Sequence, residues 1–235
     1  MKATVCLPTY NERENVERMV RALHALGVDV LVIDDNSPDG TGAIADRLAA
    51  ELDGVSVLHR ERKEGLGPAY LAGFARALAG GADLILEMDC DFSHDPADVL
   101  RLIAAAEDAD LVLASRYVEG GGTANWGLLR RIISRGGSLY AQIVLGLRVR
   151  DLTGGFKCYR RAVVEALPLA EIHSKGYAFQ IETTYRAQRA GFRVAEVPIV
   201  FVDREEGHSK MSRAIVVEAI WKVPLLRLQA LGGKL

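Results

Sequence analysis

Short apolar runs alternate with longer amphipathic segments through the first half of the chain. Such runs, bounded by turn-forming residues, are typical of buried strands. They occur at residues 3–7, 30–33, 55–58, 84–88 and 111–113. The intervening segments place apolar residues at helical spacing, and strands that alternate with helices predict an α/β fold. Right-handed crossovers then give a mainly parallel sheet with helices on both faces.

Four helices are expected between these strands. Asn11 and Glu14 form a predicted capping box at the start of the first helix. The other three begin at turn or cap residues that commonly start helices. Together the four helices are expected to cover about residues 12–26, 39–52, 67–78 and 95–106.

The regular alternation stops after Tyr117, where Gly120–Gly122 predicts a flexible hinge. Residues 126–150 then contain five arginines and no acidic residue, with apolar residues at helical spacing. One interpretation is an amphipathic helix that lies on a membrane surface or binds a partner. The other is an ordinary helix packed on the core with solvated arginines. A further helix is expected near 179–190, a strand at 194–197 and a C-terminal helix near 212–231.

Composition narrows the classes of protein that remain. The chain has 235 residues, 49% of them hydrophobic, and a net charge of −2, so no nucleic-acid partner is expected. Its three cysteines lack metal-binding spacing and indicate free thiols in a reducing compartment. The chain begins directly with a strand-like run, so no signal peptide is expected, and charged residues interrupt its longest apolar stretch at 214–228. A cytoplasmic location is therefore expected.

Two carboxylates, Asp89 and Asp91, directly follow the fourth apolar run. Carboxylates one residue apart can share a hard cation, and Mg²⁺ typically completes its coordination with water and substrate phosphates. A lone Asp-x-Asp is common and is usually a solvated turn. This copy lies between a buried strand and a helix start at 93–96, where parallel sheets collect ligands. The pattern predicts a metal-bridged phosphate site.

Polar segments follow three other predicted strands. They are Pro8–Glu12, Asp34–Gly40 and Ser115–Tyr117. A doubly wound sheet brings the ends of these strands to one edge. Their carboxylates can accept hydrogen bonds from a base or ribose, and Arg116 can bind phosphate. Each segment alone is compatible with simple turn chemistry, but together they favour a nucleotide site.

These segments, with Gly65–Gly67 and Asp89–His94, resemble the family 2 glycosyltransferases of the GT-A fold. Further segments make the chain similar to the dolichyl-phosphate (polyprenyl-phosphate) mannose synthases within that family. These are 115–117, 125–126, 151–157 and 203–210. The resemblance covers residues 3 to about 213 and implies a GT-A domain at 1–211 followed by a C-terminal helix at 212–235. Within the domain, it implies a nucleotide-binding half at 1–117 and an acceptor-binding half at 118–211.

The resemblance implies an inverting transfer of mannose from GDP-mannose to dolichyl or polyprenyl phosphate. By similarity, Pro8, Tyr10 and Glu12 line the guanosine pocket, and Asp35 holds the base or ribose. Asp89 and Asp91 would flank the sugar diphosphate and bind Mg²⁺ or Mn²⁺. Ser93 is the expected third metal ligand, at a position where the family often has Gln. Cys90 stands where a small Ala is usual and would approach the diphosphate through its backbone.

The acceptor is already anionic, so it needs positive charge rather than a strong general base. Arg116 and Arg131 are predicted to bind its phosphate, with Arg130 a further candidate, and with Asp91 they form the predicted catalytic set. Other expected substrate contacts are Arg204 and Lys210 on a loop over GDP, and Gln180 or Glu182 against mannose.

A lipid-linked acceptor implies contact with a membrane. Residues 126–150 and the C-terminal helix are the predicted docking surfaces, on the cytoplasmic face, and a separate membrane-anchor subunit is the other possibility. One alternative function uses UDP-glucose as the donor to make polyprenyl-phosphate glucose. Another is a non-catalytic sugar-nucleotide-binding subunit. A Rossmann oxidoreductase is disfavoured because the first strand lacks a Gly-x-Gly-x-x-Gly turn.

Overall fold

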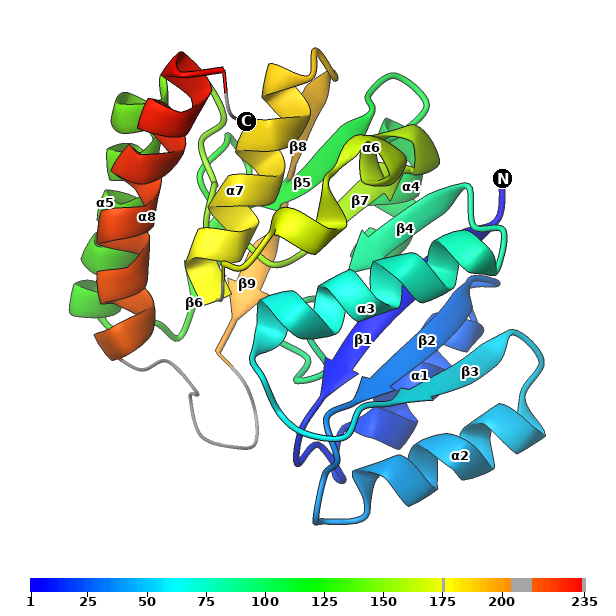
Figure 1. Ribbon diagram of the computed structural model, residues 1–235. Coiled ribbons are helices and arrows are strands. Elements are labelled where there is room, and N and C mark those ends of the chain that lie inside the picture. Colours follow the sequence, from blue (N-terminus) through cyan, green and yellow to red (C-terminus); the bar gives the residue numbers. More distant parts are fainter. Residues whose placement is uncertain (175, 204–212, 234–235) are drawn as a thin grey trace.

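A seven-stranded sheet forms the centre of the protein in a computed structural model (Figure 1). The structure describes residues 1–174, 176–203 and 213–233, with side chains of the last segment from residue 218 onward. The strand order is β3-β2-β1-β4-β7-β5-β8, and β6 and β9 form a second, two-stranded sheet. The strands are β1 (Ala3–Thr9), β2 (Asp29–Asp34), β3 (Val55–His59), β4 (Leu84–Glu87), β5 (Leu111–Ser115), β6 (Gly122–Ala124), β7 (Lys157–Arg160), β8 (Val194–Pro198) and β9 (Val200–Val202).

Helices cover both faces of the central sheet. One buried cluster joins the sheet to α3, α5, α7 and α8, and a second joins the opposite face to α1, α2 and α4. Figure 1 shows α3 and α7 crossing the near face. The helices are α1 (Val16–His24), α2 (Thr41–Glu51), α3 (Leu66–Ala79), α4 (Asp98–Ala105), α5 (Leu128–Leu145), α6 (Arg161–Ala166), α7 (Gly176–Arg189) and α8 (Arg213–Leu231), with a 3₁₀ turn at Leu169–Glu171. The expected α/β fold with a mainly parallel sheet is confirmed.

The sequence pattern did not indicate strand β7. It runs antiparallel between β4 and β5, whereas β1, β2, β3, β4 and the β5–β8 pair are parallel. Its register places Lys157 opposite Glu87, and both side chains are fully buried. β7 therefore places a buried lysine opposite a buried glutamate at the end of strand β4.

The predicted capping box at the first helix is wrong. Helix α1 begins at Val16, and its N-cap residue, Asn15, makes no side-chain cap bond. Asn11 instead adopts a left-handed backbone with φ 57°. The segment before the helix therefore forms a turn that carries Glu12 toward the sheet edge, where its N–H bonds the Thr41 hydroxyl at 3.0 Å.

Residues 128–145 form one continuous helix, α5, despite Gly136 and Gly137. Its buried face is short, and Tyr140 donates a hydrogen bond to the Ile220 carbonyl of α8 at 2.8 Å. Much of its apolar surface stays exposed: Leu128, Leu129, Ile132, Ile133, Leu139 and Ile143. The helix is therefore amphipathic, with an uncovered apolar face. No described helix is long and apolar enough to cross a membrane.

Candidate active site

A cavity of about 380 Å³ opens at the edge where the parallel strands end. Strands β1, β2 and β4 run in the same direction, so the loops that follow them meet there. The cavity collects ten of the predicted site residues: Pro8, Tyr10, Glu12, Asp35, Asp89, Cys90, Asp91, Arg116, Arg130 and Gln180. The sheet edge thus gathers side chains that are more than 170 positions apart in the chain.

The loops after β1 and β2 form one end of the cavity. Asp35 accepts a hydrogen bond from Arg60 at 2.6 Å, and burial raises the pKa of Asp35. Lys63 lies 4.0 Å above the Tyr10 ring centroid. Aromatic, carboxylate and ammonium groups that converge on one pocket suit a nucleoside: a ring to stack, hydroxyls to bind and phosphates to neutralise.

Asp89 and Asp91 lie on the loop after β4, and both line the cavity. Asp91 is 6% exposed, and its Oδ1 accepts the backbone N–H of Ser93 at 3.1 Å. Ser93, the predicted third metal ligand, is buried and does not line the cavity. No cluster of three or more His, Cys, Asp or Glu side chains suited to a metal occurs in the described ranges.

Helix α7 forms the floor beside the carboxylates. A Cβ placed on Gly155 would lie 3.5 Å from Gln180 Nε2 and 4.0 Å from Asp89 Oδ2. A glycine here therefore keeps space open between these two polar groups. Glu182 points elsewhere: it accepts hydrogen bonds from Ser174 and from Arg186, the latter at 2.8 Å, and does not line the cavity. Of the two predicted sugar contacts, only Gln180 faces the site.

Arg116 is held by a buried carboxylate. Its Nε and Nη2 donate to Asp151 at 2.7 Å each, and its backbone N–H donates to the same carboxylate at 3.0 Å. Nη2 also reaches Thr153 Oγ1 at 2.9 Å. Although burial opposes ionisation, the charge of Arg116 holds the pKa of Asp151 below its usual value. Arg116 is thus fixed in orientation at the cavity wall.

Arg130 and Arg131 have different surroundings although they are neighbours. The Arg130 guanidinium lies 4.1 Å from the Trp126 ring centroid, donates to Asp203 at 2.7 Å and lines the cavity. Arg131 is exposed, donates to the Thr123 carbonyl at 3.4 Å and lines neither this cavity nor the one beside it.

A second cavity of about 220 Å³ lies between α5, α7 and α8. Its walls are mostly apolar, and it shares Trp126, Arg130, Thr153 and Tyr177 with the first cavity. A charged, polar cavity therefore adjoins an apolar one across an aromatic and arginine wall. Such a pair of cavities suits a ligand with one anionic and one apolar end.

Lys63, His94, Trp126 and Tyr177 line the cavity but were not predicted as site residues, although His94 and Trp126 lie in segments that carry the family resemblance. His94 is buried against the Phe156 and Phe201 rings, each 5.0 Å away, and burial lowers its pKa to about 4. Lys63 lies two residues before the Gly65–Gly67 segment that carries part of the family resemblance. That proximity was the signal available for Lys63. The predicted contacts Arg204 and Lys210 lie outside the described residues.

Comparison with known proteins agrees with this arrangement. The chain matches the glycosyl transferase family 2 model over residues 4–167. It is 48% identical over 226 residues to polyprenol monophosphomannose synthase of Mycolicibacterium smegmatis, covering 94% of this chain and 85% of that one. It is 49% identical over 225 residues to undecaprenyl-phosphate mannosyltransferase of Micrococcus luteus, covering 95% and 93%.

Among solved structures, it resembles glucosyl-3-phosphoglycerate synthase of Mycobacterium tuberculosis in complex with Mn²⁺, UDP and glucosyl-3-phosphoglycerate. The TM-score is 0.69 at 22% identity, with 94% of this chain and 80% of that chain covered. This likeness confirms the expected GT-A fold. The chain belongs to glycosyltransferase family 2.

Proposed function

We propose that this enzyme transfers mannose from GDP-mannose to a polyprenyl phosphate, giving polyprenyl-phosphate mannose and GDP. Two relatives at 48% and 49% identity carry names that describe polyprenyl-phosphate mannose formation. The observation that carries the proposal is the pair of adjoining cavities. The polar one suits a sugar nucleotide, and the apolar one suits the first part of an isoprenoid chain. The shared wall, with Arg130, lies where sugar and acceptor phosphate would meet.

The donor set of the polar cavity fits a divalent cation. Asp89 and Asp91 supply two carboxylates on one loop, and Mg²⁺ sites commonly combine one or two carboxylates with substrate phosphates and water. A bound Mg²⁺ or Mn²⁺ would neutralise negative charge on the diphosphate of the leaving GDP. Mn²⁺ in the structural relative is consistent with this proposal. Ser93 is not a proposed ligand, because it is buried and does not line the cavity.

The reaction needs little proton transfer. An oxygen of the acceptor phosphate forms a bond to the anomeric carbon while GDP leaves from the opposite side with the bonding electrons, which inverts the configuration. The acceptor is anionic, so the protein must bring two anions together. Within the described part of the chain, Arg130 is the arginine that lines both cavities, and Arg116 is fixed at the wall of the first one by Asp151. The phosphate contact predicted for Arg131 stays a prediction from sequence.

The remaining substrate contacts follow from position. Pro8, Tyr10, Glu12 and Asp35 would hold the guanosine, since they form the end of the cavity away from α5 and α8. Gln180 would contact mannose from the floor, next to Asp89 and across Gly155. Cys90 lines the cavity between the two carboxylates, and its backbone would approach the diphosphate.

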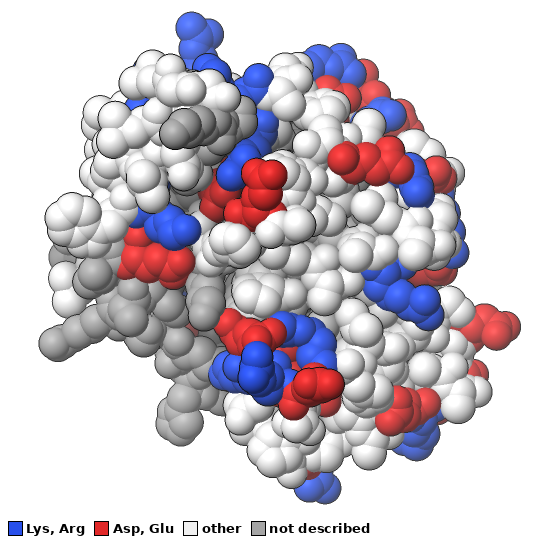
Figure 2. Space-filling view, in the orientation of Figure 1, with Lys and Arg blue, Asp and Glu red and all other residues white. Residues whose placement is uncertain are grey.

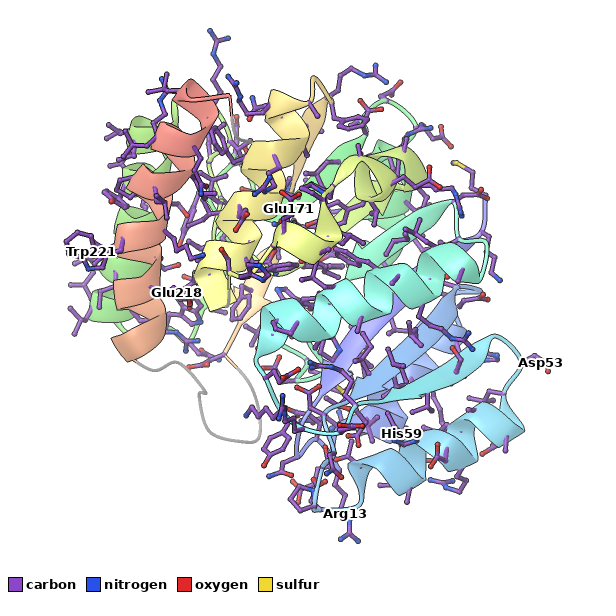
Figure 3. All side chains as sticks on the ribbon, viewed as in Figure 1. Arg13, Asp53, His59, Glu171, Glu218 and Trp221 are labelled. Carbon is purple, nitrogen blue, oxygen red and sulfur yellow. The ribbon has the colours of Figure 1, made fainter. Side chains whose placement is uncertain are left out.

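The exposed apolar faces of α5 and α8 would rest on the membrane that holds the acceptor. On α8, Trp221 is 76% exposed and projects outward from the helix (Figure 3). Ile220, Leu225 and Leu228 of the same helix are also exposed, and Figure 2 shows white surface here next to one blue and one red patch. Arginines of α5 next to these faces would attract anionic lipid, at about 1 kcal/mol for each one near the surface. Peripheral attachment on the cytoplasmic face is the corresponding proposal for location.

A competition between donors tests the proposed function. Purified enzyme is given equal amounts of GDP-mannose and UDP-glucose, each with a different radiolabel, together with polyprenyl phosphate and Mg²⁺. The lipid extract should carry the mannose label. Transfer only from UDP-glucose would contradict the proposal and identify a polyprenyl-phosphate glucosyltransferase. Repeating the assay with several polyprenyl phosphates, including dolichyl phosphate, measures the acceptor preference.

An Asp91→Ala variant separates catalysis from binding alone. It should lose at least about a hundredfold in kcat, because it removes one of the two carboxylates proposed to hold the cation that neutralises the leaving diphosphate. An exposed carboxylate provides the control: Glu165→Gln changes a surface pair with Arg161 and should keep full activity. Unchanged turnover by Asp91→Ala would exclude the catalytic interpretation in favour of a binding subunit.

A further inference from the structure

Phe92, the residue after Asp91, has a left-handed backbone with φ 57°. Among the described residues, the other non-glycine residues with positive φ are Asn11, Asn36 and Asn125. Asparagine tolerates this conformation, whereas a bulky aromatic residue there is a genuine outlier. Backbone outliers of this kind cluster at functional sites, where the surrounding structure holds them in place. The outlier here lies inside the loop that carries both cavity carboxylates.

The backbone on each side of Phe92 is fixed. Before it, Asp91 Oδ1 accepts the N–H of Ser93, two residues on, at 3.1 Å, so the carboxylate closes a turn across Phe92. After it, the Ser93 carbonyl accepts the N–H of Val202 at 3.1 Å, which ties the loop to strand β9. The orientation of the Asp91 carboxylate therefore depends on the backbone conformation of Phe92. If Phe92 left the left-handed region, Ser93 N–H would turn away from Asp91.

The Phe92 ring anchors this turn to the apolar core and to helix α1. The side chain is partly buried and packs on the apolar cluster of α1, α2 and α4. The Arg18 guanidinium of α1 lies 4.8 Å from the ring centroid, within the range of a cation–π contact. These contacts offset the unfavourable backbone of a residue that has no local preference for it. Glycine would permit the same backbone at no steric cost but would supply no ring to fix it.

We propose that Phe92 is a positioning residue for the divalent cation: its anchored, left-handed backbone aims the Asp91 carboxylate into the cavity. The inference rests on the proposed metal-dependent function and deepens it by naming the residue that preorganises a metal ligand. Phe92 itself touches neither metal nor substrate. Its replacement should weaken metal binding while leaving the fold and the nucleoside end of the cavity in place.

The test measures Mn²⁺ binding directly, by electron paramagnetic resonance of free Mn²⁺ in the presence of GDP, alongside Tm. Phe92→Ala keeps the unfavourable backbone but removes the anchor, so the Mn²⁺ affinity should fall about tenfold or more. Phe92→Gly folds without backbone strain and should also bind Mn²⁺ several-fold more weakly. Phe92→Tyr keeps the ring and should stay within about twofold of the wild type. Asn125→Ala alters a left-handed residue outside the metal loop and should leave Mn²⁺ affinity unchanged.

The outcomes separate the inference from the function on which it rests. Wild-type affinity in both Phe92→Ala and Phe92→Gly would overturn the positioning role alone. An equal loss in Phe92→Tyr would also overturn it, because the anchoring ring is still present in that variant. If the wild type binds no Mn²⁺ with GDP, the metal-dependent function fails together with the inference. Weak binding in the Ala and Gly variants, with the Tyr variant restored, supports the proposal.

Discussion

Replacing Asp151 with Asn should remove most of the stabilisation that the buried Arg116–Asp151 pair gives to the folded protein. The substitution keeps the shape of the side chain but leaves the guanidinium of Arg116, a residue that is 7% exposed, without its charge partner. Two side-chain bonds of 2.7 Å and one backbone bond of 3.0 Å to Arg116 depend on this carboxylate. Breaking a buried pair from one side costs about 3–5 kcal/mol. For a chain of this size, that corresponds to a fall in Tm of roughly 6–20 °C.

Urea denaturation, followed by circular dichroism, measures the loss against a surface control. Glu165→Gln breaks the exposed pair with Arg161 and should cost less than about 0.5 kcal/mol. The folded pKa of Asp151 is lowered, so its stabilising contribution is complete above the ordinary pKa of Asp and is lost as pH falls through the folded value. The difference in free energy of unfolding between wild type and Asp151→Asn should therefore become smaller in acid. A cost below about 1 kcal/mol at pH 7 would refute this reasoning.

Three further predictions concern other parts of the molecule. Glu87 and Lys157 lie fully buried opposite each other, and burial raises the pKa of Glu87 and lowers that of Lys157 to about 8. Lys157→Met would leave Glu87 buried without a nearby positive charge and should cost about 3 kcal/mol in urea denaturation, whereas adding Glu87→Gln should restore much of it; equal losses in the single and double variants would contradict this electrostatic coupling. Gly67→Ala should lower Tm, because a Cβ there would collide with the Ser174 carbonyl. Gly136→Ala, in open space on α5, should instead stabilise the fold by about 0.5–1 kcal/mol, and a change in Tm of the same sign in both variants would be inconsistent with the packing. Trp221→Ser should weaken sedimentation with anionic vesicles roughly tenfold, since the exposed indole would no longer be buried in lipid; unchanged sedimentation would argue against α8 as a membrane contact.

The first half of the fold was predictable because its signals are local. Apolar runs and helix starts recur at short intervals, and the loops at the carboxyl ends of parallel strands lie at the same edge of the sheet. The loops after β1, β2 and β4 therefore reached the cavity as expected. Helix boundaries were less accurate: α1 starts at Val16 because residues 12–15 form a turn.

The second half depended on contacts between distant residues. Strand β7 has four residues and follows a glycine pair, and only its neighbours β4 and β5 fix it as a strand. The Arg116–Asp151 pair joins positions 35 residues apart, so the sequence named Arg116 as a phosphate ligand without the partner that orients it. Gly136 and Gly137 disfavour a helix locally, but α5 is continuous and contacts α8.

Glu182 illustrates why residue type alone misassigns roles. It lies two residues after Gln180 on α7 and was an equal candidate for the sugar contact. Positions two apart on a helix face different directions. Gln180 consequently faces the cavity, whereas Glu182 pairs with Arg186 one turn further along.

The anomeric configuration and mass of the lipid product test the central claim most directly. GDP-mannose, a polyprenyl phosphate and Mg²⁺ are incubated with the enzyme, and the lipid extract is analysed by mass spectrometry and NMR. One mannose should be linked to the polyprenyl phosphate in the β configuration, inverted from the α-linked donor, with one GDP released and no product in the presence of EDTA. Free mannose with unmodified lipid, or an α-linked product, would contradict direct attack by the acceptor phosphate.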